Sequence, residues 1–143
     1  MNKVLVLNGP NLSKLGLRDS KIYGGIEYSK LVSEVTKEAE NLGLSVDIRQ
    51  SDDETTLISW IHEAVDGKNP IIINAAAFTH YSYAIRDALE ILKTPIIEVH
   101  ISNPLAREEF RHTSVISGVA TGTIAGFGID SYRLALKALL SIS

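Results

Sequence analysis

Two alternating patterns of hydrophobic positions run along the chain. The first is a set of short apolar runs, rich in valine and isoleucine and bounded by Gly, Pro or Asn, which predicts strands buried on both faces. Four runs have this character, and a fifth is weaker because glycine dilutes it. The four are Val4 to Leu7, Leu44 to Ile48, Pro70 to Ile73 and Pro95 to Val99, and the fifth is Thr121 to Gly126.

The second pattern has the periodicity of an amphipathic helix and separates the predicted strands. Apolar residues recur every three or four positions, so each set lines one face of a helix. Strands that alternate with helices predict a parallel sheet with right-handed crossovers. The four apolar faces are Leu31, Val35, Ala39 and Leu42; Leu57, Ile58, Ile61, Ala64 and Val65; Ala84, Ile85, Ala88, Leu89 and Leu92; and Tyr132, Ala135, Leu136, Leu139 and Leu140.

The number of these elements indicates the fold class. Five parallel strands with helices on both faces, in a chain of 143 residues, predict a flavodoxin-like doubly wound α/β fold with strand order 2-1-3-4-5. This length is enough for one ordinary core, so residues 1–143 are expected to form a single domain. Residues 9–24 have no clear periodicity, and we expect a lid or binding loop there.

Composition and charge narrow the range of partners. The net charge is -3, without the basic surplus that a binder of nucleic acid normally needs, so no nucleic acid partner is expected. Cysteine is absent, which excludes thiolate nucleophiles and disulfides and fits a cytoplasmic protein. The first apolar run is too short for a signal peptide or a membrane span, so we expect a soluble, unexported protein with no membrane partner.

Polar side chains follow the first, third and fourth predicted strands. These strands are neighbours in the predicted order, and ligands of such sheets bind beyond the carboxyl ends of the strands. We therefore expect the groups to converge at one edge of the sheet. They are Asn8 and Asn11 after the first strand, Asn74 and His80 at and after the end of the third, and Glu98, His100, Ser102, Arg107 and Arg111 at and after the end of the fourth, where the apolar Ile101 separates His100 from Ser102.

Glu98 and His100 form the most informative pair. Residues two apart in a strand point to the same side, so the carboxylate is placed to orient the imidazole or hold its proton, an arrangement that suits a general acid. The alternative is a histidine that caps its own strand through a backbone carbonyl. The predicted neighbours Asn11, Asn74 and His80 favour the chemical interpretation.

The other histidines carry less information. His80 is equally suited to a backbone hydrogen bond and to ligand binding, and His62 and His112 are interpreted as surface or structural residues. A zinc site made of His80, His100 and His112 is disfavoured, because no pair has the close spacing of known sites and no cysteine is present to assist. We therefore expect no metal.

The predicted lid carries Arg18, Asp19 and Tyr23 within six positions. A tyrosine beside a cation can act as a base, because the positive charge stabilises the phenolate. A loop tyrosine is otherwise a packing residue, and the arginines and the predicted convergence favour the chemical role.

Several reaction types lack their motifs. There is no G-x-S-x-G elbow for acyl transfer and no G-x-x-x-x-G-K-[ST] loop for nucleotide phosphates. Gly126 and Gly128 resemble half of a dinucleotide fingerprint, but we interpret them as tight strand-to-helix packing. Apart from Lys14 and Lys21 in the lid, the lysines fall away from the predicted site, which argues against imine chemistry.

Five linked segments, which together cover nearly the whole chain, resemble type II 3-dehydroquinate dehydratases. They are NGPNLSKLG with RDSKIYG, INAAAFTHYSYAIRDAL, EVHISNPLAREEFRH and GTIAGFGIDSYRLAL. The resemblance implies the flavodoxin-like fold and the dehydration of 3-dehydroquinate to 3-dehydroshikimate in the shikimate pathway of aromatic amino acid biosynthesis. It also implies that no metal, cofactor or imine takes part and that the chain assembles as a dodecamer built from trimers.

The resemblance also implies roles for the residues that match its motifs. Tyr23 matches the base, which removes a proton beside the ketone as a phenolate, and Arg18 matches the arginine that supports it. Asn11 matches the residue that helps to stabilise the enolate through a bound water. His100 matches the general acid, with Glu98 as its orienting partner.

Substrate binding is implied for a second set of positions. Asn74, His80 and Arg111 match residues that hold the hydroxyls and the ring, the backbone amides of Ile101 and Ser102 match those that hold the carboxylate, and Arg107 matches a second arginine near the base. Asp87 matches an acidic residue that reaches the site of a neighbouring subunit. Without the resemblance, Asp87 would be interpreted as a helix-surface charge paired with Arg86 or another neighbour.

One departure from the family concerns the lid. Where the family usually has Arg-Glu-Pro, this chain has Arg18, Asp19 and Ser20. Losing the proline gives the open lid more conformational freedom, so we predict a lid that is disordered or variably placed without ligand.

Other functions on the same fold remain as alternatives. A phosphoreceiver would have acidic residues where this chain has Asn8 and Asn74, and a flavin carrier would have a Ser/Thr-rich loop after the first strand. A different lyase or an isomerase acting on a polyhydroxylated acid, or an inactive family member, also stays open. So does the choice between a biosynthetic role and quinate breakdown.

Overall fold

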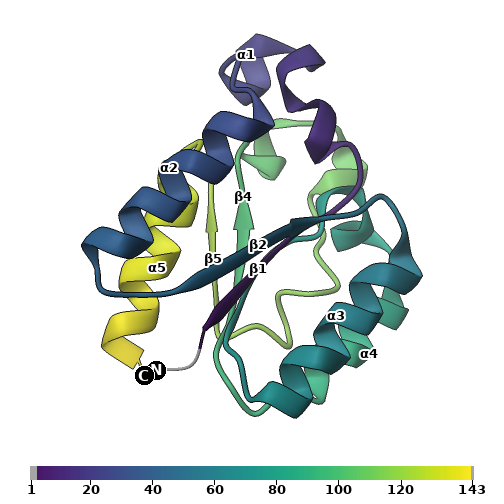
Figure 1. The fold of residues 1–143 in the computed structure, drawn as a ribbon. Coiled ribbons are helices and arrows are strands. Elements are labelled where there is room, and N and C mark those ends of the chain that lie inside the picture. The colour runs from purple at the N-terminus through teal and green to yellow at the C-terminus, as the bar shows by residue number, and fades with distance from the viewer. Residues whose placement is uncertain (1–2, 143) are drawn as a thin grey trace.

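A parallel five-stranded sheet organises residues 3–142, the part of the chain that the computed structural model describes (Figure 1). The strand order is β2-β1-β3-β4-β5 and every neighbouring pair is parallel, which confirms the predicted topology. The strands are β1 (Val4–Asn8), β2 (Val46–Gln50), β3 (Ile71–Asn74), β4 (Ile96–His100) and β5 (Gly122–Ala125).

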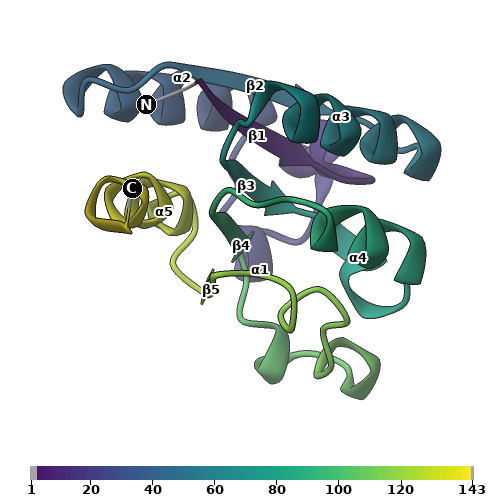
Figure 2. The ribbon, with the colours of Figure 1, turned by 90° about the horizontal axis from the view of Figure 1, so that it is seen from below.

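Helices cover both faces of the sheet, as expected for a doubly wound fold (Figure 2). The helices α2 (Tyr28–Asn41) and α5 (Asp130–Ile142) lie on one face, and α3 (Glu54–Gly67) and α4 (Tyr83–Glu90) lie on the other. Short helices occupy the connections: η1 (Leu12–Leu17), α1 (Ser20–Tyr23), η2 (Ala76–His80), η3 (Pro104–Ala106) and η4 (Glu109–Arg111). None of the helices within the described residues has the length and apolar character needed to cross a membrane.

The alternation of side chains along β1 produces two separate cores. Val4 and Val6 pack toward α2 and α5, whereas Leu5 and Leu7 pack toward α3 and α4. Every residue of β1, β3 and β4 is buried, and burial of each large aliphatic side chain stabilises the fold by about 1.5–3 kcal/mol. The register of the sheet is therefore set from both sides.

The second strand differs from its prediction in two ways. It begins at Val46 rather than Leu44, because the amide of Leu44 bonds to the carbonyl of Ala39 and so belongs to the end of α2. It is also half-buried rather than buried on both faces, because it lies at the edge of the sheet. Its Arg49 pairs with Asp47 at 2.7 Å and with Glu63 of α3 at 2.8 Å, and charged side chains of this kind discourage pairing with another edge.

The segment after β1 is not the structureless loop that its sequence suggests. It contains η1 and α1, each too short to produce a visible hydrophobic period. The Asp19 side chain accepts a hydrogen bond from the amide of Lys21 at 2.9 Å and caps α1, and Gly24 ends the helix with a φ of 73°. The predicted variability of this lid without ligand stays a prediction.

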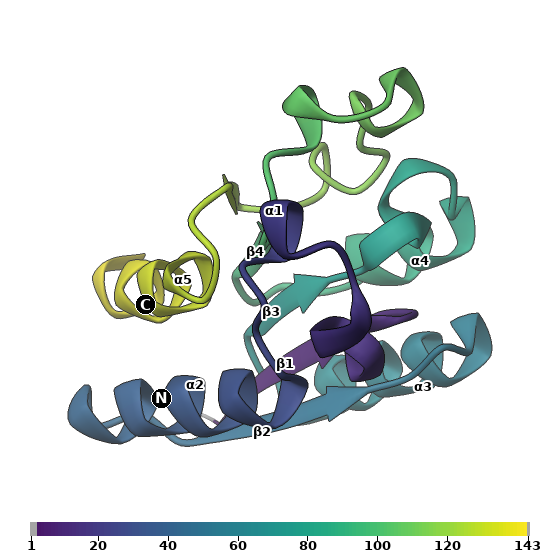
Figure 3. The same cartoon turned by 90° about the horizontal axis from the view of Figure 1, so that it is seen from above.

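The loops that follow the strands gather at one end of the molecule (Figure 3). The loop after β1 is held close to the end of β3, since the Gly9 amide donates to the carbonyl of Asn74 at 2.8 Å. A β-carbon on Gly9 would lie 2.6 Å from the carbonyl oxygen of Ala75, which is backbone and cannot easily move. This close approach requires glycine.

We expect Gly9→Ala to lower the free energy of unfolding by about 1–3 kcal/mol, because the new methyl group overpacks the contact between two backbones. Urea denaturation measures the effect. The matched control is Gly118→Ala, where a β-carbon meets no atom within 4 Å, and its change should stay within about 0.5 kcal/mol. Equal effects of the two substitutions would contradict the prediction.

Candidate active site

A cleft opens at the carboxyl ends of β1, β3 and β4, beneath α1. Its lining combines the lid with the loops after these strands. Ten of the twelve predicted site residues line it, while Glu98 lies behind the cleft and Asp87 lies elsewhere on the surface. The ten are Asn11, Arg18, Tyr23, Asn74, His80, His100, Ile101, Ser102, Arg107 and Arg111.

Two cationic side chains surround the tyrosine of the lid. Tyr23 is only 6% exposed, and the guanidinium carbon of Arg18 lies 4.1 Å from its ring centroid. The guanidinium of Arg107, from the loop after η3, lies 5.1 Å from the same centroid. Both guanidinium groups are therefore within cation–π distance of the same aromatic ring.

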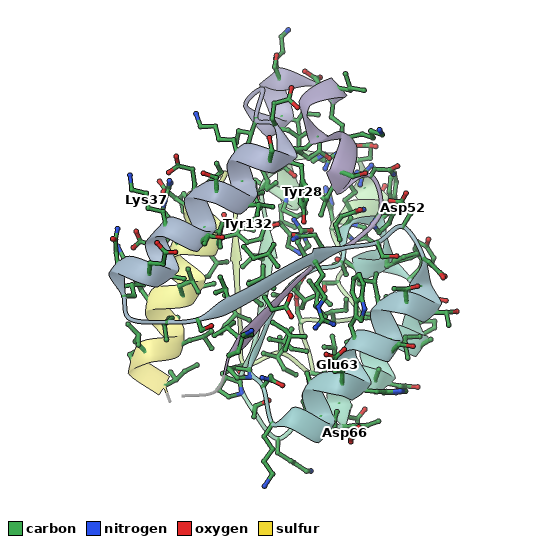
Figure 4. All side chains as sticks on the ribbon, viewed as in Figure 1. Tyr28, Lys37, Asp52, Glu63, Asp66 and Tyr132 are labelled. Atoms are coloured by element: carbon green, nitrogen blue, oxygen red, sulfur yellow. The ribbon has the colours of Figure 1, made fainter. Side chains whose placement is uncertain are left out.

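Asn11 is held in an unusual backbone conformation. Its φ of 71° lies in the left-handed region, where asparagine is more acceptable than most residues. Asp52, labelled in Figure 4, lies in the loop after β2. Its carboxylate accepts from the Asn11 amide at 2.9 Å and from the Gln50 side chain at 3.0 Å. The hydrogen bond from the Asn11 backbone is the largest influence on the pKa of Asp52 and lowers it, which favours the carboxylate form.

The predicted pair on β4 is in contact. Nε2 of His100 lies 2.5 Å from Oε2 of Glu98, and the carboxylate is 1% exposed. Burial alone raises the pKa of Glu98, but hydrogen bonds, first from His100 and then from Ser117, lower it below the usual value. The imidazole therefore contacts a carboxylate rather than only a backbone carbonyl of its own strand.

His80 combines the two interpretations that its sequence leaves open. Its Nδ1 lies 2.8 Å from the carbonyl oxygen of Thr113, and the side chain also lines the cleft. Burial is the largest influence on its ionisation and lowers the pKa of His80, which favours the neutral ring at pH 7. A neutral imidazole anchored at one nitrogen can still exchange a hydrogen bond with a ligand through the other.

A buried network joins three polar side chains, of which Asn74 lines the cleft and the other two lie behind it. The hydroxyl of Tyr132 in α5 donates to Oδ1 of Asn8 at 2.7 Å and accepts from Nδ2 of Asn74 at 3.0 Å. Burial raises the pKa of Tyr132, so the phenol is neutral. Tyr28 lies close by (Figure 4), and its pKa is also raised by burial.

The amides of Ile101 and Ser102 are oriented by the turn after β5. The carbonyls of His100 and Ile101 accept from the amides of Gly126 and Gly128, at 3.2 and 3.0 Å. Because the N–H of a planar trans peptide points opposite to its carbonyl, both amides point away from that turn. Gly126 and Gly128 have φ values of 96° and 62°, so this turn needs glycine for its backbone conformation rather than for tight packing as the sequence suggested.

The remaining sequence candidates lie outside the cleft. Asp87 is exposed on α4 and pairs with Arg86 at 2.8 Å, and within this chain it takes no part in the site. Nε2 of His112 lies 3.0 Å from the carbonyl of Arg107, a structural contact. Across residues 3–142, no group of three or more His, Cys, Asp or Glu side chains is arranged to hold a metal ion.

Sequence reasoning missed the residues that hold the site from behind. Tyr132 fits the apolar face of its helix, so its sequence position suggested only core packing. Asp52 and Ser117 lie in loops without periodicity. The signal that could have found Tyr132 is the strand order. It makes Asn8 and Asn74 neighbours, and two buried amide side chains need a hydrogen-bond partner.

Comparison with known proteins identifies relatives over almost the whole chain. The family described as "Dehydroquinase class II" matches residues 2–140. The 3-dehydroquinate dehydratase of Mycobacteroides abscessus is 54% identical over 134 residues, which are 94% of this chain and 93% of that protein. That of Caldicellulosiruptor bescii is 52% identical over 143 residues, with 99% of each covered. The crystal structure of a type II dehydroquinase from Propionibacterium acnes superposes with a TM-score of 0.94 at 51% identity and covers 99% of this chain and 98% of that one.

We expect Tyr132→Phe to lower the free energy of unfolding by about 1–3 kcal/mol, because Oδ1 of Asn8 and Nδ2 of Asn74 each lose the hydrogen bond to the buried Tyr132 hydroxyl. Equilibrium denaturation provides the measurement. Tyr83→Phe is the control, since Tyr83 is 69% exposed and should tolerate the same change. An unchanged midpoint for Tyr132→Phe would show that the network does not stabilise the fold.

Proposed function

The chain belongs to the class II dehydroquinase family, and from this membership we propose that it is a hydro-lyase converting 3-dehydroquinate to 3-dehydroshikimate, a step of the shikimate pathway. The observation that carries the proposal is the pair of side chains in one cleft. A tyrosine between two arginines and a histidine backed by a carboxylate supply a base and an acid for the loss of water.

In the proposed reaction, the Tyr23 phenolate removes a proton from the carbon beside the ketone. The electron pair of the broken C–H bond moves to the ketone oxygen and forms an enolate. Arg18 and Arg107 stabilise the phenolate before the transfer, and Asn11 stabilises the enolate through a bound water molecule. The hydrogen bond from the Asn11 amide to Asp52 supports this role. It fixes the backbone of Asn11, and a donor that is already in place needs little reorganisation during the reaction.

The second half of the reaction expels the hydroxyl group. His100 donates a proton to the departing oxygen, the C–O bond breaks, and the enolate electrons form the new C=C bond while the ketone is restored. Water leaves, with Tyr23 now protonated and His100 neutral. The base comes from the lid and the acid from β4, and we propose that they act on opposite faces of the ring in an anti elimination.

The proposed substrate contacts follow from the lining of the cleft. The amides of Ile101 and Ser102 hold the carboxylate, which suits two N–H groups beside a strand end. Asn74, His80 and Arg111 hold the hydroxyls and the ring. These assignments are supported by the position of the residues, all of which line the same cleft as Tyr23 and His100.

We further propose that the single domain of residues 1–143 works as a homo-oligomer, a dodecamer built from trimers. Asp87 would then complete the cleft of a neighbouring subunit, because within its own chain it lies away from the site. The cytoplasmic location expected from the sequence stays a prediction.

Purified protein is expected to convert 3-dehydroquinate to a conjugated enone, followed by its ultraviolet absorbance. Tyr23→Phe should lower kcat by about 10²–10⁴-fold, because it removes the base while keeping the ring. His100→Ala should cause a loss of similar size through the missing acid. Circular dichroism confirms folding. Wild-type turnover in the folded Tyr23→Phe variant would remove Tyr23 from the base role, and wild-type turnover in His100→Ala would do the same for the acid.

The role of Asp87 across subunits is tested by mixing variants. Asp87→Ala and Tyr23→Phe are each expected to be nearly inactive, whereas co-expression should restore activity in about a quarter of the sites, since one subunit supplies Tyr23 and its neighbour supplies Asp87. Light scattering gives the mass of the assemblies. A mixture no more active than its components would contradict action across subunits.

A further inference from the structure

The carboxylate of Glu98 receives several hydrogen bonds besides the one from His100. The hydroxyl of Ser117 donates to Oε1 at 2.5 Å, and that of Ser114 lies 3.0 Å from Oε2 and 3.2 Å from Oε1. Thr123 of β5 makes a longer contact of 3.4 Å with Oε1. Three hydroxyl groups from the region between η4 and the end of β5 therefore surround this carboxylate on the side away from the cleft.

The chemical type of these partners matters. A carboxylate that is 1% exposed becomes neutral unless its charge is stabilised by its surroundings. Hydroxyl groups stabilise the charge by hydrogen bonding but do not neutralise it, as an arginine or a lysine would. The full negative charge of Glu98 therefore stays available to His100, which must carry a proton to act as an acid.

We propose that Ser117, supported by Ser114, is a positioning residue for the reaction, whose hydroxyl keeps Glu98 ionised and directed at His100. The inference rests on the proposed function, in which His100 is the acid. Ser117 itself does not line the cleft that holds Tyr23 and His100, so it acts through Glu98 rather than on the substrate.

The loop that carries Ser117 is built to fix its position. Oγ of Ser114 accepts from the backbone amides of Ile116 and Ser117, both at 3.1 Å, which closes a tight turn. Ile116 is fully buried in the core beneath α3 and α4, and the amide of Val115 donates to the carbonyl of Thr79 at 2.9 Å. The position of the Ser117 hydroxyl is therefore set by core packing and not by a free loop.

A serine hydroxyl has only one proton to donate. The contacts that Ser114 and Ser117 make with Glu98 therefore differ. Ser117 gives its proton to Oε1 over 2.5 Å, whereas Ser114 shares a longer contact with both oxygens while its lone pairs hold the turn. Loss of the Ser114 hydroxyl would disturb the turn as well as the carboxylate. Substitution of Ser117 therefore tests the hydrogen bond to Glu98 without removing the acceptor that closes the turn.

Several ionisable groups near the Glu98 carboxylate also contribute to the pH dependence of kcat. Beside His100 these are His80 of η2, Arg111 of η4 and His112, which line the cavity behind the dyad together with Glu98. The pKa of Glu98 is lowered, so its ionised form is lost as the pH falls through that value. Removing the Ser117 hydroxyl raises the pKa of Glu98, and the loss then begins at a higher pH.

The first test is Ser117→Ala in the 3-dehydroquinate assay. We expect kcat to fall about tenfold to a hundredfold, the loss that accompanies a missing hydrogen bond to a charged group, with KM changed less than twofold. The acid limb of the pH profile of kcat should move to higher pH. Ser117→Thr, which keeps a hydroxyl, should restore both kcat and the pH profile.

The second test separates positioning from a merely structural role. In a Glu98→Gln background, Ser117→Ala should cause no further loss of kcat, because the carboxylate through which it acts is gone. Thr123→Val is the matched control, since its 3.4 Å contact is weak and its kcat should stay within about twofold of wild type. Thermal unfolding of each variant verifies that the fold is kept.

The outcomes distinguish this inference from the proposed function. If His100→Ala is inactive while Ser117→Ala keeps the wild-type kcat and pH profile, the inference is wrong and the assignment of the acid survives. An equal effect of Ser117→Ala with Glu98 or Gln at position 98 would also overturn it. If His100→Ala keeps wild-type activity, the proposed acid fails instead.

Discussion

The register of the three central strands is the constraint on which the rest of the site depends. Asn8 pairs with Asn74 across β1 and β3, and Ile73 pairs with Glu98 across β3 and β4. A slip of one residue in β4 would turn Glu98 and His100 to the other face of the sheet. The alternating apolar side chains fill two cores and resist such a slip, so packing far from the cleft fixes its chemistry.

Groups of opposite charge lie beside the two side chains to which the proposed reaction assigns the proton transfers. The lid tyrosine has guanidinium groups beside its ring, and the histidine has a carboxylate behind its imidazole. In the proposed reaction, the first arrangement favours the charge of a phenolate base and the second favours the charge of an imidazolium acid, so one cleft can remove a proton and supply another.

The sequence predicted the parts of the structure that follow from short-range periodicity. Runs of valine and isoleucine located the strands, and a spacing of two residues placed Glu98 and His100 on one side of β4. The ends of the elements and the contacts that support the site could not be predicted from periodicity. The start of β2 depends on how α2 ends, and α1 is too short for a periodic pattern. Ser117 meets Glu98 from 19 positions away, and Tyr132 meets Asn8 from 124 positions away, so neither contact leaves a local signal.

The hydrogen bond between Tyr132 and Asn74 joins the C-terminal helix to a side chain that lines the cleft. Local unfolding of α5 therefore removes the hydroxyl that orients Asn74. The free energy of opening α5 and the free energy of disordering the Asn74 side chain are coupled through this hydrogen bond. By thermodynamic linkage, any small molecule that binds the ordered asparagine must also protect the backbone amides of α5 from exchange with solvent. Occupancy of the cleft thus stabilises a helix that lines no part of it.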